Sequence, residues 1–569
     1  MNTPTIHGGS AARAESESRA QPSATWSQEE QRCYLASGLW ENKSLFHYFE
    51  QSVKRFPDRC AIIYPVSLSY AALMEQVLML ASRLKGRGIQ AQDKVLIQLP
   101  NSPAFVQYFL ACLAIGAVPV MALPAHRRRE LNYLLDASDA RAFISQGANA
   151  GGRCTPAAMH TPAWQGEHIV VSAPHWTPQS QDRAIPQIHN PAGSDIALLQ
   201  LSGGTTGLPK LIPRTHNDYA YSIRQSNDIC RVNEHSVFLC VLPASHNFTL
   251  SSPGILGTLF AGGALVLADT LSAHEAFSMI LRWGITHAAL VPPLALNWLH
   301  YWRMEPNVGK PLAAMTSLLV GGAKLNPCSA KALVDELGAP LQQVFGMAEG
   351  LVNYTRLDDS TERICTTQGR PLSPCDQVLV VDDDDQPVAR GEVGHLLTKG
   401  PYTIRAYLNA AEHNKRAFTQ SGFYRTGDLV SVDKQGNITV EGRAKDQINR
   451  GGEKVSAAEL ENYLVSHPQI LDAAVVAIPD AFLGEKTGAF LVIKDGVSIT
   501  LPECRAFLRG FDIAEFKLPD HIYCTAKLPT THFGKIDKRA LRDWAGAGAL
   551  HSAMPAPGAV THPFNLEQP

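Results

Sequence analysis

The sequence predicts an α/β protein with more than one domain. Its 569 residues exceed the size at which a single hydrophobic core stops growing, so at least one further domain is expected. Short β-branched runs bounded by Gly or Pro alternate with segments of helix length, which is typical of layered α/β units. Because the runs are almost continuously apolar, we expect strands covered on both faces, in largely parallel sheets.

The first part of the chain supplies most of these runs. One stretch, residues 105–125, approaches the length of a membrane span, but Gly116 and Pro119 divide it. Ser102 followed by Pro103 has the pattern of a helix N-cap with proline in the first turn. A buried helix over 103–115 and a buried strand over 118–123 are therefore predicted, and no membrane partner. The predicted strands are 94–98, 118–123, 196–201, 236–242, 264–268, 287–291 and 317–320.

Two changes of pattern divide the rest of the chain. Beyond residue 376 short strands separated by turn residues predict a β-rich subdomain that belongs to the large N-terminal domain. From residue 445 helix-like and strand-like segments mix, which predicts a small α+β C-terminal domain. The predicted strands and helices are 378–381, 394–398, 429–432, 437–441, 457–466, 471–477, 488–493 and 501–510. The predicted division is a disordered leader 1–27, an N-terminal domain 28–444, a C-terminal domain 445–545 and a loose tail 546–569.

Charge and cysteine content narrow the functional class. Lys and Arg together number 50 against 52 for Asp and Glu, so the chain lacks the basic character of a nucleic-acid-binding protein. The 11 cysteines are scattered, without a C-x-x-C pair or a Cys/His cluster at zinc spacing. We interpret them as reduced thiols of a cytoplasmic protein, since the leader also lacks the apolar core of a secretory signal.

The strongest local motif is the segment 202–210, which follows an apolar run. Its three glycines let the backbone turn N–H groups inward, its hydroxyls add donors and Lys210 adds a positive charge, a set that suits a polyphosphate. The spacing differs from a Walker A loop. A Gly/Thr-rich turn between two strands is the alternative. The polar and glycine residues of this segment are Ser202, Gly203, Gly204, Thr205, Thr206, Gly207 and Lys210.

This segment resembles the phosphate-loop signature of the adenylate-forming superfamily, which includes acyl-CoA synthetases, non-ribosomal peptide adenylation domains and firefly-type luciferases. Further motifs follow in that family's order: Phe-Gly-Met-Ala-Glu at 345–349, Tyr-Arg-Thr-Gly-Asp at 424–428, Gly-Arg-Ala-Lys-Asp-Gln-Ile at 442–448 and Gly-Lys at 534–535. The resemblance implies activation of a carboxylic acid by ATP to an acyl-adenylate, followed by transfer of the acyl group to a thiol.

The resemblance also implies roles for single residues. Glu349 holds Mg²⁺ on the phosphates, and Lys535 bridges the substrate carboxylate and the α-phosphate, so both are catalytic. Asp428 accepts hydrogen bonds from the ribose hydroxyls, with help from Arg443. Without their motifs these would be ordinary surface or turn residues. The resemblance adds Gly321, Gly322, Ala323, Phe345 and Gly346 to the nucleotide site, beside the residues of segment 202–210.

Members of this family rotate the C-terminal domain between their two half-reactions. The resemblance places the hinge at Lys445, two residues after the Gly-Arg pair, and makes the C-terminal domain mobile. Gly451 and Gly452 then lie along the channel for a pantetheine arm. A helix-capping turn before residues 457–466 is the alternative for this loop.

Differences from the general motifs of the superfamily indicate which class of acid is activated. The segments 245–254 and 449–454 resemble the stand-alone aryl-acid–AMP ligases of catechol and phenol siderophore biosynthesis. No acidic residue begins the segment 245–254, where amino-acid adenylation domains place an Asp, so a neutral acid fits better. By resemblance Asn247 binds an ortho hydroxyl, Phe248 packs on the ring and His246 lies by the pocket entrance. The remaining predicted pocket residues are Ser252, Val344 and Val352.

Two of these residues favour 2,3-dihydroxybenzoate over salicylate. Ser252 can pair with a 3-hydroxyl where salicylate-type relatives tend to carry Cys, and Val352 is smaller than their aliphatic residues at that point. The alternatives are a salicylate-AMP ligase, an aryl-CoA ligase and a non-catalytic homologue. Because the chain lacks a carrier motif in a folded context, the predicted partner is an aryl carrier protein in trans.

Overall fold

The computed structural model of the chain describes residues 26–147, 164, 166–172, 188–202, 209–268, 272–305, 311–450, 453–480, 482–511, 513–531 and 535–546. The predicted leader and tail lie almost entirely outside these ranges. Trp26 and Ser27 correct the leader boundary, because Trp26 is buried and its indole N–H donates to the Gly400 carbonyl (3.3 Å), while Ser27 caps the first helix.

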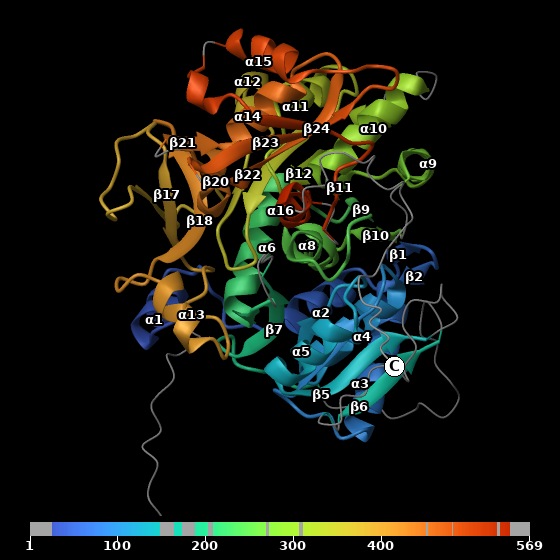
Figure 1. Ribbon diagram of the computed structural model, residues 1–569. Helices are drawn as coiled ribbons and strands as arrows, with labels where there is room; N and C mark the ends of the chain where they lie inside the picture. The colour runs from blue at the N-terminus through green and yellow to red at the C-terminus, as the bar shows by residue number, and fades with distance from the viewer. Residues whose placement is uncertain are drawn as a thin grey trace, which may run out of the picture.

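Two largely parallel sheets form the N-terminal part of the fold (Figure 1). In the smaller sheet the strands lie in the order β6-β5-β3-β4-β7-β8, and all pairs are parallel except the hairpin β7–β8. Its strands are β3 (Lys94–Gln98), β4 (Val118–Met121), β5 (Ala140–Gln146), β6 (Glu167–Val171), β7 (Ile196–Leu201) and β8 (Leu211–Thr215).

The second sheet has nine strands in the order β15-β14-β13-β12-β11-β9-β10-β1-β2. Its central pairs, from β13 to β1, are parallel, and antiparallel strands close both edges. The strands are β1 (Cys60–Tyr64), β2 (Leu68–Ser69), β9 (Val237–Cys240), β10 (Ala264–Leu267), β11 (His287–Leu290), β12 (Ser317–Gly321), β13 (Leu341–Gly346), β14 (Val352–Tyr354) and β15 (Arg370–Pro371).

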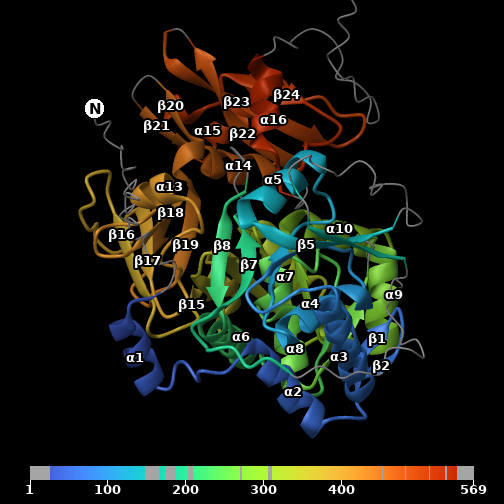
Figure 2. The ribbon, with the colours of Figure 1, turned by 90° about the horizontal axis from the view of Figure 1, so that it is seen from below.

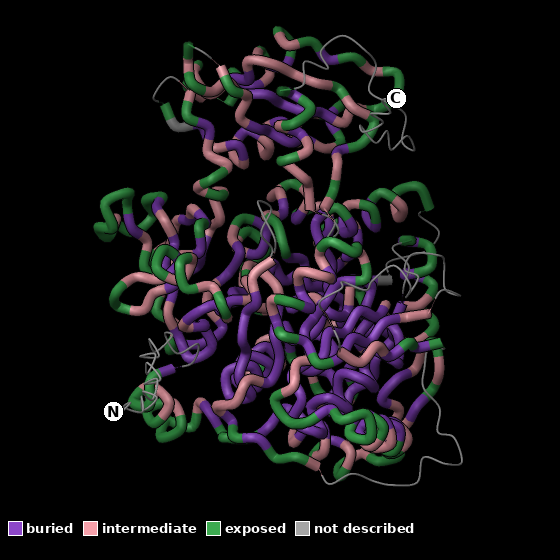
Figure 3. Tube along the Cα trace, turned by 60° about the horizontal axis from the view of Figure 1, so that its bottom comes forward, coloured by how far each residue is buried: buried purple, intermediate pink, exposed green. Residues whose placement is uncertain are grey.

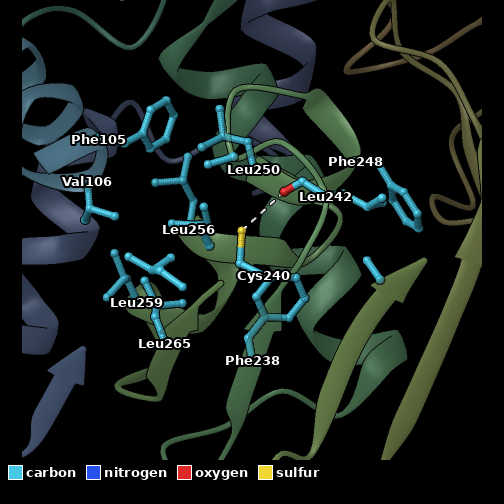
Figure 4. Packing of buried hydrophobic residues seen from close by; sticks show 14 of the residues in the cluster. Phe105, Val106, Phe238, Cys240, Leu242, Phe248, Leu250, Leu256, Leu259 and Leu265 are labelled. Carbon is cyan, nitrogen blue, oxygen red and sulfur yellow. Dashed lines mark hydrogen bonds between the residues drawn. The ribbon is translucent and has the colours of Figure 1, made fainter. Parts of the chain in front are cut away.

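Helices pack on these sheets and share one large apolar core with them. Figure 4 shows part of this core, where Cys240 lies among leucines and Phe248 lies at the edge with its ring turned away from them. The helices of this part are α1 (Gln28–Ala36), α2 (Leu45–Arg55), α3 (Tyr70–Gly86), α4 (Pro103–Ala114), α5 (Arg128–Ser138), α6 (His216–Cys230), α7 (Asn247–Ser251), α8 (Gly254–Ala261), α9 (Ala273–Trp283), α10 (Pro292–Met304), α11 (Pro327–Asp335) and α12 (Thr361–Thr366).

The apolar stretch 105–125 is the predicted buried helix and strand. Every residue of α4 is buried, Ser102 caps it by accepting from the Phe105 N–H (3.4 Å), and Gly116 turns the chain with a φ of 74° before β4. Among the described residues, no helix combines the length and apolar character needed to cross a membrane. The ten cysteines that the structure describes are free thiols, as the sequence predicts.

A four-stranded antiparallel sheet in the order β16-β17-β18-β19 forms the predicted β-rich region. The strand β18 begins at Tyr424, five residues before the predicted start at 429. Asp428 therefore lies within a strand, which is kinked at Gly427 (φ 73°). The elements are β16 (Gln377–Val381), β17 (Gly394–Lys399), α13 (Ala411–Ala417), β18 (Tyr424–Val432) and β19 (Ile438–Arg443).

The C-terminal elements build a separate α+β unit with its own core (Figures 2 and 3). Its sheet has the order β21-β20-β23-β22, with β24 parallel to β23. The elements are β20 (Gln447–Arg450), β21 (Glu453–Ser456), α14 (Ala457–Val465), β22 (Ile470–Asp480), β23 (Gly484–Ile493), α15 (Leu501–Arg509), β24 (His521–Cys524) and α16 (Lys538–Gly546). The structure thus confirms the predicted fold class.

Candidate active site

The segment 202–210 connects two antiparallel strands at the end of the smaller sheet. Ser202 and Lys210 close its base, because the Ser202 N–H donates to the Lys210 carbonyl (3.0 Å) and the Lys210 N–H donates to Ser202 Oγ (2.9 Å). A Walker A loop would lead into a helix, so the strand on each side confirms that this is a different kind of loop. Gly203, Gly204, Thr205, Thr206 and Gly207 lie outside the described residues.

Glu349 follows the end of β13 and is buried against two tyrosines. The Tyr407 hydroxyl donates to Glu349 Oε1 (2.7 Å) and lies 2.9 Å from the Tyr424 hydroxyl. Lys210 Nζ lies 6.0 Å from the centroid of the Tyr407 ring, so the base of the glycine-rich loop and the predicted metal ligand share this tyrosine. Tyr407 and Tyr424 fix one carboxylate oxygen of Glu349.

The turn that carries Glu349 is also held from behind by a buried ion pair. Arg214 Nη2 and Asp218 Oδ1 are 2.6 Å apart, and neither side chain is more than 2% exposed. Arg214 Nη1 donates to the Ala348 carbonyl (2.8 Å) and Nη2 to the Tyr402 carbonyl (3.2 Å). Removing either charge would leave the other buried and unpaired, so we expect this turn to be rigid.

Asp428 and Arg443 face each other across the neighbouring strands β18 and β19. Arg443 Nε lies 2.7 Å from Asp428 Oδ1, and the two residues are register partners. Burial raises the pKa of Asp428, an effect that the Arg443 charge opposes. The other oxygen, Oδ2, is buried and has no hydrogen-bond partner among the described residues. An unpaired buried acceptor is costly, so this oxygen is suited to a hydroxyl group of a ligand.

Lys535 reaches the same place from the C-terminal unit. Its Cε would lie 3.4 Å from a Cβ added to Gly322, at the end of β12. Burial and the nearby Arg443 charge lower the pKa of Lys535 to about 8, and Asp428 and Glu349 oppose that shift. The ammonium group of Lys535 therefore lies within electrostatic reach of all three residues that the sequence assigns to nucleotide and metal binding.

The predicted metal ligand Glu349 is not part of a larger ligand cluster. Among the described residues no group of three or more His, Cys, Asp or Glu side chains is arranged to hold a metal ion. A divalent cation here would take one carboxylate oxygen from the protein and complete its shell with phosphate oxygens and water, as is typical of Mg²⁺. A hard oxygen ligand beside a polyphosphate loop fits that mode of binding.

Beside these charged groups lie neutral residues of α7 and of the ends of β12, β13 and β14, where the sequence predicts the acid pocket. Gly321 brings a wall close to the Phe248 ring, since an added Cβ would lie 2.8 Å from the Val344 carbonyl and 3.3 Å from Phe248 Cζ. Val344 and Val352 are buried beside it. The structure thus brings together the predicted pocket residues His246, Asn247, Phe248, Ser252, Val344 and Val352.

His246 caps α7 and lies within electrostatic reach of Lys535. Its Nδ1 accepts from the Phe248 N–H (3.3 Å), which caps α7. Burial and the Lys535 charge lower the pKa of His246 to about 3, so the imidazole is neutral at physiological pH. The imidazole therefore adds no positive charge to this part of the site.

For the remaining predicted residues of the nucleotide site, the hinge and the pantetheine channel, the structure gives fewer contacts. Gly322, Ala323 and Gly346 are exposed and Phe345 is half-buried, which leaves open surface at the ends of β12 and β13 for a flat ring. Lys445 lies in a 3₁₀ turn (Ala444–Asp446) between β19 and β20, and its role as a hinge stays a prediction. Gly451 and Gly452 lie outside the described residues.

The family models match both parts of the chain. The model described as AMP-binding enzyme matches residues 49–408, and the model described as AMP-binding enzyme C-terminal domain matches residues 459–535. The chain belongs to the family of AMP-binding enzymes. It is therefore an adenylate-forming enzyme that uses ATP, as the five sequence motifs predict.

Similar proteins of known function match nearly the whole chain. It is similar to the vibriobactin-specific 2,3-dihydroxybenzoate-AMP ligase of Vibrio cholerae, with 46% identity over 90% of this chain and 95% of the relative. The 2,3-dihydroxybenzoate-AMP ligase of Bacillus subtilis is 44% identical over 91% of this chain and 96% of its own. Among solved structures, apo MbtA from Mycobacterium smegmatis has a TM-score of 0.66 and 38% identity, covering 91% of this chain and 98% of that chain.

The sequence analysis missed the residues that hold the site in place. Tyr219 and Tyr407 bond the predicted site residues Asn247 and Glu349, and Tyr424, Arg214 and Asp218 support these contacts or the turn before Glu349, yet none of the five was predicted as a site residue. One signal was present, because an Arg and an Asp four residues apart at the end of an apolar run are an unusual pair to bury. The tyrosines carried no such signal, since a buried tyrosine is normal in any core.

Proposed function

We propose that this adenylate-forming enzyme activates 2,3-dihydroxybenzoate to the aryl-adenylate and then transfers the aryl group to the phosphopantetheine thiol of an aryl carrier protein, in siderophore biosynthesis. The single observation that carries the proposal is the convergence of four charged groups, Glu349, Asp428, Arg443 and Lys535, beside the neutral side chains of α7 and β13. The two 2,3-dihydroxybenzoate-AMP ligases to which the chain is similar support the choice of acid.

In the first half-reaction an oxygen of the aryl carboxylate attacks the α-phosphorus of ATP, and pyrophosphate leaves. The Lys535 ammonium orients the carboxylate toward the phosphorus and offsets the charge that builds there. Asp428 Oδ2 accepts from the ribose hydroxyls, while the glycine-rich loop from Ser202 to Lys210 binds the departing phosphates. Glu349 would hold a Mg²⁺ ion on the phosphates, and that ion would supply positive charge to offset the polyphosphate.

The hydroxyl groups of the pocket support 2,3-dihydroxybenzoate in particular. Ser252 is buried at the C-terminal end of α7, next to the residues of the predicted acid pocket. Its hydroxyl oxygen can accept a hydrogen bond from a donor on the ring of the acid. The 3-hydroxyl of 2,3-dihydroxybenzoate is such a donor, whereas salicylate has none at that position.

In the second half-reaction the thiol attacks the adenylate carbonyl, and AMP leaves. We propose that the unit from 445 to 545 turns about Lys445 for this step, so that Lys535 withdraws and the loop with Gly451 and Gly452 faces the pantetheine arm. The rotation would then replace Lys535 in the cleft by the loop that carries Gly451 and Gly452.

Acid-dependent ATP–pyrophosphate exchange tests the proposal directly. We expect exchange with 2,3-dihydroxybenzoate at a higher kcat/KM than with salicylate, and a higher salicylate value would make the chain a salicylate-AMP ligase. Incubating the adenylate with coenzyme A and, separately, with a phosphopantetheinylated aryl carrier protein then identifies the acceptor. Faster transfer to coenzyme A would instead indicate an aryl-CoA ligase, and a chain without any exchange would be non-catalytic.

A further inference from the structure

Asn247 is held by a chain of buried hydrogen bonds that begins beside the phosphate loop. Gln200, two residues before Ser202, donates through Nε2 to the Tyr219 hydroxyl (3.3 Å). The Tyr219 hydroxyl in turn donates to Asn247 Oδ1 (2.8 Å). The side chains of Gln200 and Tyr219 are buried, so solvent does not compete for either bond.

These contacts decide which way the Asn247 amide faces. Oδ1 accepts from the Tyr219 hydroxyl and also lies 3.4 Å from Ser251 Oγ, which donates to the Asn247 backbone carbonyl (3.0 Å). The Asn247 Nδ2 group bonds to no acceptor among the described residues. Because an amide has its oxygen and nitrogen on opposite sides, fixing the oxygen on Tyr219 turns the two N–H donors the other way.

Tyr219 itself is fixed from a third side. The Arg214 guanidinium lies 4.8 Å from the centroid of the Tyr219 ring, and Asp218 holds that guanidinium in place. Burial raises the pKa of Tyr219 to about 12, so its hydroxyl stays protonated and remains a donor at every pH at which the protein is used. Because the Tyr219 hydroxyl oxygen already accepts from Gln200 Nε2, its hydrogen is directed to Asn247 Oδ1, which favours the amide orientation with Nδ2 turned away from Tyr219.

We infer that Tyr219 is a positioning residue for substrate specificity, which orients Asn247 so that the pocket offers a donor, and no acceptor, to the group ortho to the carboxylate. This inference rests on the proposed function and names the ortho group that the pocket selects. An ortho hydroxyl donates to its own carboxylate and turns a lone pair outward, which the Nδ2 donors can bind. An ortho amino group turns an N–H outward instead, and that N–H meets a second donor.

The experiment compares Tyr219→Phe with the wild type in ATP–pyrophosphate exchange. We expect kcat/KM to fall about tenfold for 2,3-dihydroxybenzoate and salicylate, mainly through KM, and less than about twofold for 3-hydroxybenzoate, which has no ortho oxygen. The matched control is Tyr221→Phe, since Tyr221 is buried on the same helix but bonds Ser373 Oγ (2.7 Å), and this change should leave the ratio between the acids unaltered.

Other outcomes would overturn the inference. An equal fall for all three acids in Tyr219→Phe would mean that the hydroxyl only supports the fold, and no fall for any would mean that it does not orient Asn247. In an Asn247→Ala background, Tyr219→Phe should not further change the ratio of kcat/KM for the ortho-hydroxy acids to kcat/KM for 3-hydroxybenzoate. A further fall in that ratio would also count against the inference. A wild type without exchange on any aryl acid would defeat the proposed function instead.

A second measurement does not depend on Tyr219→Phe being stable. The wild type should prefer salicylate over anthranilate, its ortho-amino analogue, by at least about thirtyfold in kcat/KM. Asn247→Asp, which presents a carboxylate oxygen where the N–H donors were, should narrow that preference about tenfold or more. Equal use of the two acids by the wild type, or an unchanged preference in Asn247→Asp, would overturn the inference.

Discussion

The nucleotide end and the acid end of the cleft are built in opposite ways. At the nucleotide end Glu349, Asp428, Arg443 and Lys535 come from four separate segments, one of them in the C-terminal unit, and Asp428 Oδ2 has no hydrogen-bond partner among the described residues. At the acid end, neutral groups on β7, α6 and α7 form a hydrogen-bond chain within the N-terminal part. The groups at the proposed nucleotide end therefore depend on how the C-terminal unit is placed, whereas those at the proposed acid end are held within the N-terminal part alone.

Two groups at the nucleotide end, Lys535 and Asp428, are in environments that a bound nucleotide would improve. Lys535 faces the like charge of Arg443, and Asp428 Oδ2 faces no donor among the described residues. A polyphosphate with its ribose relieves both conditions at once, so binding energy is available where the chemistry occurs. Changes at this end should affect the rate strongly, and changes at the acid end should affect the choice of acid.

The largest effect is expected for Lys535→Ala. The first half-reaction should slow roughly hundredfold to thousandfold, because the ammonium group that we propose offsets the transition-state charge is lost. Thioester formation from preformed adenylate should change far less. Lys538→Ala is the control, since Lys538 pairs with Glu461 (2.7 Å) on the same unit. Equal losses in both half-reactions would remove Lys535 from its proposed role.

Asp428→Asn should weaken use of ATP roughly thirtyfold in kcat/KM, because a charged acceptor for the ribose hydroxyls becomes a neutral one. KM for the acid should change much less. Asp385→Asn serves as the control, since its carboxylate pairs with Arg425 at 2.5 and 2.6 Å on the exposed surface, where ion pairs contribute little. A similar effect of both substitutions on KM for ATP would show that Asp428 acts only through general charge.

Raising the pH should slow adenylation through Lys535. Its pKa of about 8 lies below the ordinary value for lysine, so the free enzyme loses the ammonium group as the pH rises through that range. We expect kcat/KM for ATP at about pH 9 to be roughly tenfold below its value at neutral pH. Lys535→Arg should keep its charge and flatten this fall. A wild-type profile that stays level to about pH 9.5 would contradict the assignment.

The smallest effect is expected at the acid end, for Ser252→Ala. The preference for 2,3-dihydroxybenzoate over salicylate in kcat/KM should fall roughly fivefold, the value of one neutral hydrogen bond to the 3-hydroxyl. Ser138→Ala is a matched control, because that buried serine donates to the Leu134 carbonyl far from the pocket (2.6 Å). An unchanged preference would mean that Ser252 does not contact the 3-hydroxyl.

Elements that depend on local pattern were predicted well. The strand 94–98 and the helix that begins at Pro103 follow from apolar periodicity and capping, which act over a few residues, and the structure confirms both. The start of β18 was missed, because pairing with β17 extends that strand through Gly427, a residue that normally ends one. Here pairing with β17 outweighed the local tendency of Gly427 to end a strand.

The sequence by itself determined which chemical groups the site contains, because Glu349, Asp428, Arg443 and Lys535 belong to motifs whose order and spacing are local properties. It could not determine which side chains hold these groups in place. That Tyr219 turns the Asn247 amide, and that Arg214 and Tyr407 fix the turn with Glu349, depends on contacts between segments up to 134 residues apart. Such contacts arise only when the sheets pack together, and only the tertiary structure decided them.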